Sequence, residues 1–271
     1  MQSLWDRFSP KPASLWWRVF CCATLRGMYL LLLIQRYGAW RGGLLYFRLN
    51  VLKASSIQLP EFSRPVHLRR DLQDVHAFAQ VFLHREYDFD WPEDVRRIVD
   101  GGANVGFASL CFKGQFPEAQ IHAVEPHPHN AKAFRNNTSH LEGITLSQKA
   151  LHHSDNVQLR LTDEGFGSNG FMTREEASNN MVGDVETLSI GGIQKTMGWE
   201  EIDLVKLDIE GGEHALFQAN LDWMERTRFI VLEFHEWMVP SSSKPALQAL
   251  ADKGFAVLDI RGENVLFGRS A

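Results

Sequence analysis

From Arg97 onwards, short apolar runs alternate with segments of helical periodicity. The apolar runs cover residues 98–100, 121–125 and 144–150, and the helical segments between them cover residues 107–116 and 130–139. This alternation is typical of a parallel sheet in which a helix follows each strand and crosses back over the sheet. The pattern therefore predicts an α/β fold.

The second half of the chain keeps strand character, with one interruption. Residues 157–162 alternate like an antiparallel strand, and the glycine-rich residues 163–170 predict a loop of the kind that often closes over a ligand. Further strands are predicted at residues 182–188, 202–208 and 229–234, and a helix is predicted over residues 213–220. Two last runs, 255–260 and 265–268, flank a turn and predict a terminal hairpin.

The chain before this sheet has a different pattern. Residues 12–50 have helical character, and Asp71 is a favourable N-cap for a further helix over residues 72–87. We therefore predict two parts: a basic, helical N-terminal extension over residues 1–69 and a main domain over residues 70–271.

Charge is distributed unevenly between these parts. The chain of 271 residues has a formal charge of −5, but residues 1–55 carry eight Arg or Lys and one Asp, which is +7 and leaves −12 for the rest. An acidic main domain argues against a nucleic-acid partner. Two interpretations of the basic segment stay open: it packs on the main domain as a helical extension, or it rests peripherally on an anionic membrane surface.

The cysteines and the apolar runs indicate in which cellular compartment the protein is expected. Cys21, Cys22 and Cys111 show neither metal-ligand spacing nor a disulfide framework, so a reducing compartment is expected. The run Met28–Ile34 is too short to span a bilayer, and the N-terminus lacks the plan of a signal peptide. We therefore expect a cytoplasmic protein, with contact at the inner membrane surface if the basic segment binds lipid.

The main domain is organised around the stretch Ile98-Val99-Asp100-Gly101-Gly102-Ala103-Asn104-Val105-Gly106. It predicts a strand that ends at Asp100 and leads through a glycine-rich turn into a helix, with main-chain N–H groups of the turn facing a ligand. Ala103 stands where the second glycine of G-x-G-x-x-G would be, and no Gly-Lys-Ser/Thr follows. Dinucleotide and nucleoside-triphosphate sites are therefore both disfavoured.

Acids end the strands of the predicted sheet. Ligands of an open parallel sheet bind at the carboxyl ends of its strands, and four strands here end at Asp100, Glu125, Asp208 and Glu233. Glu125, followed by Pro126, ends the second strand and can accept hydrogen bonds from both hydroxyls of a ribose. Together with the glycine turn, this acid indicates an adenosine-containing cofactor.

Candidate catalytic groups follow the later strands. Asp208 ends a central strand and faces the same edge as the acids of the first two strands, whereas Glu213 is expected in the first turn of a helix, where the dipole favours an acid. Lys206 is expected to pair with a nearby acid. Alternation places Glu233 and His235 on one side of the backbone, where His235 could act as a base near neutral pH.

Four segments resemble the FkbM-type S-adenosylmethionine-dependent methyltransferases: VDGGANVG at 99–106, VEP at 124–126, DLVKLDIEGGE at 203–213 and VLEFHEW at 231–237. The resemblance runs from about Leu68 to Gly268. It implies a class I methyltransferase fold, with a Rossmann-like, mostly parallel sheet of order 3-2-1-4-5-7-6 whose last strand is antiparallel. It also implies methyl transfer from S-adenosyl-L-methionine to a hydroxyl of a small molecule, a sugar-containing natural product or a glycan.

The same resemblance implies the residues of the site. Asp100, Gly102, Asn104 and Gly106 would surround the methionine half of the cofactor, and Glu125 would hold its ribose. The full set of cofactor-binding residues expected in this way is Asp100, Gly101, Gly102, Ala103, Asn104, Gly106, Glu125, Pro126, Ala150 and Asp208, with residues 148–151 near the adenine.

For the reaction, we expect Asp208 and His235 to be the catalytic residues on the acceptor side of the methyl group. In one version His235 takes the hydroxyl proton while Asp208 orients it. In the other, Asp208, Glu233 and His235 ligate a divalent ion that polarises the hydroxyl. The metal-free version is favoured, because the sequence shows no second ligand motif.

Two other classes of protein stay open at this point. One is a nicotinamide-dependent oxidoreductase, which also uses an acid after the second strand but would require a glycine pattern that this chain lacks. The other is a non-catalytic scaffold with a methyltransferase fold, which binds a partner or a membrane surface.

Overall fold

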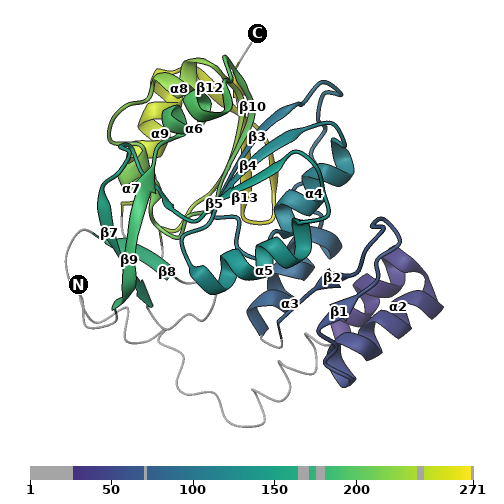
Figure 1. The fold of residues 1–271 in the computed structure, drawn as a ribbon. Coiled ribbons are helices and arrows are strands. Elements are labelled where there is room, and N and C mark those ends of the chain that lie inside the picture. The colour runs from purple at the N-terminus through teal and green to yellow at the C-terminus, as the bar shows by residue number, and fades with distance from the viewer. Residues whose placement is uncertain (1–26, 70–71, 164–170, 175–180, 237–240, 270–271) are drawn as a thin grey trace, which may run out of the picture. The chain divides into compact units, whose positions relative to one another are not determined.

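The computed structural model describes residues 27–69, 72–163, 171–174, 181–236 and 241–269 (Figure 1). It divides into two compact units, Met1–Ala54 and Ser55–Ala271. This division lies earlier in the chain than the predicted boundary after residue 69.

Residues 55–69 belong to the second unit because their strands and hydrogen bonds lie there. β1 (Ser56–Ile57) pairs antiparallel with β2 (Val66–His67). The His67 N–H donates to Asn137 Oδ1 at 2.7 Å, and Asn137 Nδ2 donates to His67 O at 3.0 Å. The hairpin is thereby joined to a helix far along the chain.

The first unit is helical in the part that the structure describes. A helix over residues 27–37 is followed, after Gly38 with φ +81°, by α2 (Ala39–Tyr46) and the π-helical η2 (Phe47–Val51). The predicted helical character is confirmed for these residues, whereas residues 12–26 lie outside the described part.

Large apolar side chains are exposed on these helices. Trp40 is 86% exposed and Leu31 is 66% exposed. Arg36, Arg41 and Arg48 lie in the same segment, and the sequence has no Asp or Glu between residues 27 and 54. The surface of the helices within residues 27–54 is therefore both apolar and basic.

No helix in the described ranges is long and apolar enough to cross a membrane.

A seven-stranded sheet forms the centre of the second unit, in the order β12-β13-β11-β10-β3-β4-β5. Its strands are β3 (Arg97–Gly101), β4 (Gln120–Val124), β5 (Ile144–Ser147), β10 (Ile202–Leu207), β11 (Thr227–Glu233), β12 (Phe255–Arg261) and β13 (Asn264–Arg269). All neighbours are parallel except β13, which is antiparallel to β11 and to β12. Numbered along the chain and read from β5, the strands lie in the order 3-2-1-4-5-7-6. The α/β fold, the mostly parallel sheet and the terminal hairpin are confirmed.

Helices cover both faces of this sheet (Figure 1). One set contains α3 (Leu72–Phe78), the π-helical η3 (Ala79–Leu83), α4 (Phe107–Gln115) and α5 (Pro128–Thr138), and the other contains α6 (Ile190–Met197), α7 (Glu213–Leu216), α8 (Asp222–Glu225) and α9 (Ser243–Asp252). The second set packs its apolar side chains on β10 and β11, where Ile193, Trp223 and Leu250 share one buried cluster with Val205 and Ile230. Every residue of β10 is buried, as expected for a central parallel strand.

Two helices differ from what the sequence pattern predicts, one in its length and one in its presence. The helix predicted over residues 213–220 is the short α7, and α6 forms although it contains two adjacent glycines. α6 is stabilised at its start because the Ser189 side chain accepts a hydrogen bond from Gly192 N, and Ile190 and Ile193 are buried. Capping and burial thus outweigh the low helix propensity of glycine.

A smaller sheet lies beside the main one, in the order β6-β9-β7-β8. Its strands are β6 (Ala150–Leu151), β7 (Gln158–Asp163), β8 (Phe171–Arg174) and β9 (Met181–Leu188). β7 is antiparallel to β8 and β9, which confirms the antiparallel strand predicted at residues 157–162. From residue 164 to residue 170, the predicted glycine-rich loop lies outside the described residues.

Candidate active site

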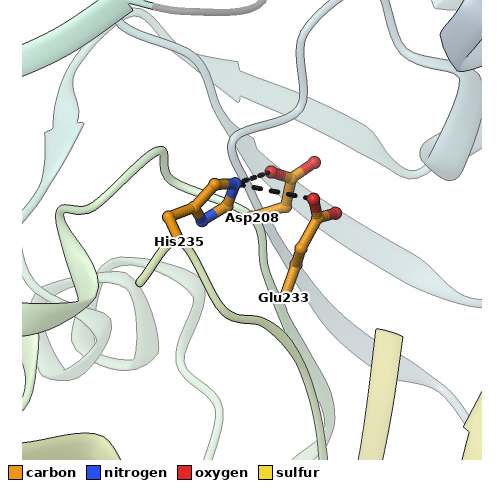
Figure 2. A group of neighbouring side chains, drawn as sticks. All are labelled: Asp208, Glu233 and His235. Atoms are coloured by element: carbon orange, nitrogen blue, oxygen red, sulfur yellow. Dashed lines mark ion pairs between the residues drawn. The ribbon is translucent and has the colours of Figure 1, made fainter. Parts of the chain in front are cut away.

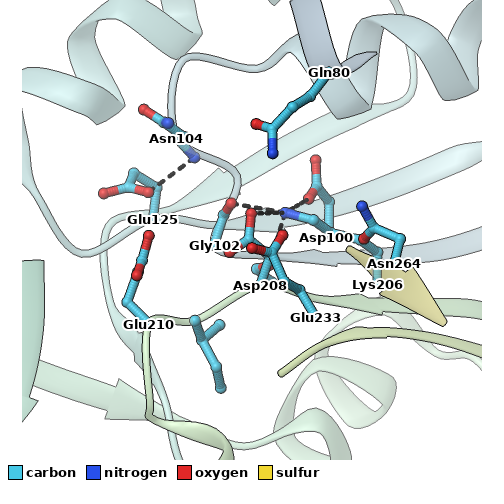
Figure 3. Close-up of polar contacts among 12 residues, drawn as sticks. Gln80, Asp100, Gly102, Asn104, Glu125, Lys206, Asp208, Glu210, Glu233 and Asn264 are labelled. Atoms are coloured by element: carbon cyan, nitrogen blue, oxygen red, sulfur yellow. Dashed lines mark hydrogen bonds and ion pairs between the residues drawn. The ribbon is translucent and has the colours of Figure 1, made fainter. Parts of the chain in front are cut away.

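The glycine-rich turn joins the carboxyl end of β3 to α4 (Figure 3). Gly102 has φ +72°, and a Cβ there would lie 1.7 Å from the main-chain oxygen of Asp208, so only glycine fits. The N–H groups of Gly102 and Ala103 both donate to Val124 O at 3.0 Å. These N–H groups therefore bind the protein itself, and the prediction that they face a ligand is wrong.

Glu125 is buried beside this turn and accepts hydrogen bonds at both carboxylate oxygens. Asn104 N–H donates to Oε2 at 2.9 Å, while His127 N–H and Asn130 Nδ2 donate to Oε1 at 2.8 and 3.2 Å. Burial raises the pKa of Glu125 to about 7, although the three hydrogen bonds oppose this shift. The carboxyl group is thus fixed at the end of β4, and its charge changes near neutral pH.

Lys206 ties the turn to the end of β10 (Figure 3). Its buried Nζ donates to Gly102 O at 2.8 Å and to Gly101 O at 3.1 Å, and lies 3.3 Å from Asp100 Oδ1 and 3.5 Å from Asp208 Oδ2. Burial alone would lower the pKa of Lys206, but the charges of Asp100 and Asp208 raise it, so the ammonium group stays charged. The predicted pairing of Lys206 with a nearby acid is confirmed.

His235 lies among four carboxylates at the ends of β10 and β11. Its Nδ1 is 3.0 Å from Glu213 Oε1, and its Nε2 is 3.4 Å from Glu210 Oε2 and 3.5 Å from both Asp208 Oδ1 and Glu233 Oε1. Figure 2 shows Nε2 pointing toward Asp208 and Glu233. The predicted placement of Glu233 and His235 on one side of the backbone is confirmed.

Burial and the crowding of charges shift the pKa values of Glu210, Glu233 and His235. Burial first, and then the charge of Asp208, raises the pKa of Glu233 to about 9 and that of Glu210 to about 8. Burial alone would lower the pKa of His235, but its hydrogen bond with Glu213 and the nearby carboxylates raise it to about 10. The rises at Glu210 and Glu233 express the cost of burying like charges together, whereas the rise at His235 expresses the attraction of the carboxylates for its positive charge.

A narrow cavity of about 40 Å³ lies between the glycine turn and the carboxylates. The predicted residues that line it are Gly102, Ala103, Asn104, Asp208 and Glu233. Seven other predicted residues are not on its wall: Asp100, Gly101, Gly106, Glu125, Pro126, Ala150 and His235. The structure therefore gathers the turn and two of the acids around one space, with His235 behind the acids.

Two of the residues away from the wall have clear structural partners. Asp100 is fully buried and accepts a hydrogen bond from Ser109 Oγ at 2.6 Å, in addition to its ion pair with Lys206. Ala150 packs with Leu159 in the core of the smaller sheet.

An outer cleft of about 380 Å³ shares Gln80 and Glu86 with the cavity. Its walls come from the α3–η3 region and the turn between β12 and β13, and they are polar: His76, Gln80, His84, Glu86, Gly262 and Glu263. Asn264 Nδ2 donates to Glu86 Oε2 at 3.0 Å, and Gln80 Nε2 donates to Glu263 Oε2 at 3.2 Å. These contacts join the two walls, and the shared residues Gln80 and Glu86 place the cleft next to the cavity.

The sequence pattern did not predict that Glu213 contacts His235, or that Glu86 and Asn264 pair beside the cavity. Glu213 is 1% exposed and binds the imidazole, because the chain turns back through Glu210 and Gly211, both with positive φ. The indication in the sequence was the segment DIEGGE, where Gly211, which has a positive φ, lets the chain turn back so that a second acid lies near the first. Glu86 and Asn264 meet only through tertiary packing, so no local pattern indicates them.

A larger hollow of about 620 Å³ lies between α6, α8 and the turn at residues 153–155. It contains neither the glycine turn nor the carboxylate cluster. We therefore choose the smaller cavity, together with the outer cleft beside it, as the candidate site. The glycine turn and the acids line this cavity, whereas the hollow is only larger.

Comparisons with known proteins all identify methyltransferases as the similar proteins. A family model for the methyltransferase FkbM domain matches residues 100–257. Methyltransferase sdnD of Sordaria araneosa is 27% identical over 241 residues, which cover 73% of this chain and 92% of that protein. The 2-O-methyltransferase NoeI of Sinorhizobium fredii is 23% identical over 224 residues, which cover 76% of this chain and 87% of that protein.

Among solved structures, a methyltransferase FkbM from Methylobacillus flagellatus is similar with a TM-score of 0.47 at 12% identity. The similar region covers 73% of this chain and 50% of that chain.

The close approach at Gly102 leads to a prediction about stability. We expect Gly102→Ala to destabilise the protein by more than Gly198→Ala, a control with φ +67° but open space around its Cβ. The control should cost about 1–2 kcal/mol for a left-handed residue, and Gly102→Ala roughly 1–3 kcal/mol more for the collision with Asp208 O. Urea unfolding of both variants measures the difference. Equal costs would mean that the end of β10 moves aside easily.

Proposed function

The chain belongs to the FkbM methyltransferase family, and we propose that it transfers the methyl group of S-adenosyl-L-methionine to a hydroxyl oxygen. The fold is that of class I methyltransferases, an α/β architecture around a seven-stranded, mostly parallel sheet. The proposed acceptor is a small molecule, a sugar-containing natural product or a glycan. One relative carries the name 2-O-methyltransferase, which supports oxygen as the acceptor atom.

The proposed cofactor site is the turn after β3 together with the end of β4. The absence of a Cβ at Gly102 lets the turn lie directly against β10, and Ala103 and Asn104 line the cavity. Glu125 presents a fixed carboxylate that can accept hydrogen bonds from ribose hydroxyls. We assign the methionine half of the cofactor to the turn and the ribose to Glu125.

The acceptor is proposed to enter through the outer cleft and to place its hydroxyl beside Asp208 and Glu233. As the acceptor oxygen forms a bond to the methyl carbon, the S–CH₃ bond breaks and its electron pair stays on sulfur, which gives S-adenosylhomocysteine. The hydroxyl proton passes to the carboxylate of Asp208 on the cavity wall. Alignment of the oxygen behind the methyl group and exclusion of water are the main tasks of the protein.

Within this proposal Asp208 and His235 have different roles. Asp208 lines the cavity, so it can touch the acceptor, whereas His235 lies behind it and is 3% exposed. Glu213, rather than Asp208, holds the imidazole through Nδ1. We therefore assign Asp208 to the acceptor and His235 to the positioning of the carboxylates.

The single observation that carries the proposal is the position of the cavity between the glycine turn and the Asp208–Glu233 carboxylates. A nicotinamide-dependent oxidoreductase is disfavoured by the family. A non-catalytic scaffold is separated from an enzyme by binding: an enzyme of this class binds S-adenosylhomocysteine and not NAD, and a scaffold binds neither.

The ribose assignment predicts the effect of Glu125→Gln. We expect this variant to bind S-adenosylhomocysteine about 1.5–3 kcal/mol more weakly, the range for hydrogen bonds to a charged group. Because the pKa of Glu125 is raised to about 7, wild-type affinity should rise from pH 6 to pH 8 as the carboxylate forms, and the variant should lose this dependence. Calorimetry measures both effects.

The control for this experiment is Glu118→Gln, which removes an exposed charge shortly before the same strand. It should leave the affinity and its pH dependence unchanged. A folded Glu125→Gln variant with wild-type affinity at pH 8 would remove Glu125 from ribose binding.

The assignment of Asp208 predicts a loss of turnover without a loss of cofactor affinity. Asp208→Asn keeps the size and removes the charge, so methyl transfer should fall by about 10²-fold or more, the usual contribution of a positioned acid or base. The measurement is transfer of label from methyl-labelled S-adenosylmethionine into fractionated host extract, with calorimetry of S-adenosylhomocysteine alongside. Normal turnover would exclude Asp208 from the reaction, and lost cofactor binding would reassign it to the cofactor pocket.

A second role is proposed for the basic segment, as a peripheral contact with an anionic membrane surface. The observation that favours it is the exposure of Trp40 and Leu31 among arginines, without any acid between residues 27 and 54. Exposed aromatic rings favour the membrane interface, and basic side chains are attracted to anionic lipid.

This role predicts that the full chain sediments with phosphatidylserine-containing vesicles at low salt and less so at high salt. Arg41→Gln should weaken binding by about 1 kcal/mol, the value for one basic side chain near such a surface. Arg135→Gln, an exposed arginine of α5, is the control and should have no effect. Failure of the wild-type protein to sediment at low salt would end the membrane hypothesis.

A further inference from the structure

We propose that a divalent cation binds at the carboxyl ends of β10 and β11, held by Asp208, Glu233 and His235. The inference deepens the proposed function and rests on it for the role of the ion, although the site itself is defined by geometry alone. It differs from the metal-free version that the sequence favoured.

The distances within the cluster fit a shared ion better than hydrogen bonds. One ligand atom from each of the three residues lies within 4.8 Å of the others (Figure 2). The Nε2 of His235 is 3.5 Å from both Asp208 Oδ1 and Glu233 Oε1, beyond the usual N–H···O range of about 2.7–3.2 Å. Two ligands about 2.1–2.4 Å from an ion are roughly 3.0–3.4 Å apart at right angles and further apart at wider angles, so separations of 3.5 Å are compatible with a shared ion.

The imidazole is oriented as a metal ligand would be. Glu213 Oε1 lies 3.0 Å from Nδ1 of His235 and also accepts a hydrogen bond from Ile209 N–H at 3.2 Å. Glu213 is 1% exposed and His235 is 3% exposed, so this pair is held rigidly. A carboxylate on one ring nitrogen directs the other nitrogen toward a metal and raises its basicity as a ligand.

The charges around Nε2 also favour a cation. Asp208, Glu210 and Glu233 converge there with one oxygen each at 3.4–3.5 Å. The nearby ammonium group of Lys206 is 3.5 Å from Asp208, but it is already bound to Asp100 and to two main-chain oxygens. A divalent ion would displace the proton from Nε2 of His235 and bring two positive charges to the three carboxylates in its place.

The donor set defines the class of ion. Carboxylate oxygens suit Mg²⁺ and Mn²⁺, and one imidazole among them makes Mn²⁺ a suitable probe. Asp208 and Glu233 both line the cavity, so an ion on them would face the acceptor and act as a Lewis acid on its hydroxyl. Each carboxylate needs only one oxygen for the ion, which leaves its second oxygen to take the hydroxyl proton.

The test is a titration of the full chain, stripped of metal with a chelator, with Mn²⁺ followed by electron paramagnetic resonance and calorimetry. We expect one saturable site that Mg²⁺ competes for. Glu213→Gln should weaken Mn²⁺ binding by about 10–100-fold, as for other residues that orient a ligand, and Asp208→Asn and Glu233→Gln should weaken it at least as much. Circular dichroism checks that each variant is folded.

The matched control is Glu201→Gln, which removes an exposed carboxylate just before β10, at the opposite end of the strand from Asp208. The strand separates the two ends by about 20 Å, more than the screening length of about 10 Å in 0.1 M salt, so Mn²⁺ affinity should not change. The proposal is overturned if the wild-type protein shows no saturable Mn²⁺ site, or if the Asp208 and Glu233 variants bind like wild type.

Binding of S-adenosylhomocysteine in chelator separates this inference from the proposed function. If the protein binds S-adenosylhomocysteine but the Mn²⁺ titration is flat, the inference is wrong and the proposed function stands. If Mn²⁺ binds at the cluster and S-adenosylhomocysteine does not bind, the proposed function is wrong and the ion site stands.

Discussion

The buried ammonium group of Lys206 holds together the parts on which the site depends. It binds the main-chain oxygens of Gly101 and Gly102 on one strand end and lies between Asp100 and Asp208 on two neighbouring strands. Removal of one partner from such a buried arrangement leaves an uncompensated charge, which is strongly destabilising. The turn and the end of β10 therefore keep a fixed separation, and the cavity between the turn and the carboxylates keeps its shape.

The pattern along the chain predicted most of the sheet but only part of the site. Strand ends were predictable because apolar runs stop at acids, so Asp208 and Glu233 were assigned to one edge correctly. The role of Glu213 was not, because an acid in the first turn of a helix has an ordinary explanation in the dipole. Only the backbone path through Glu210 and Gly211, both with positive φ, brings it to His235.

Two carboxyl groups of the unit show how similar side chains acquire different properties. Glu125 is buried but is surrounded by hydrogen-bond donors, two of them main-chain N–H groups, so its position is fixed by the glycine turn and by the start of α5. Glu233 lies among other carboxylates and has the larger rise in pKa. The first environment suits recognition of a neutral hydroxyl group, whereas the second favours positive charge.

The outer cleft is built from segments that take no part in the turn after β3. Its walls, the α3–η3 region and the β12–β13 turn, meet through Glu86 and Asn264 at one side of the sheet. Substitutions at wall residues that do not also line the cavity, such as His76 and His84, therefore leave the glycine turn and Lys206 in place. In a fold divided in this way, the residues of the outer cleft can change, and with them the molecule that binds there, while the glycine turn and the carboxylates stay the same.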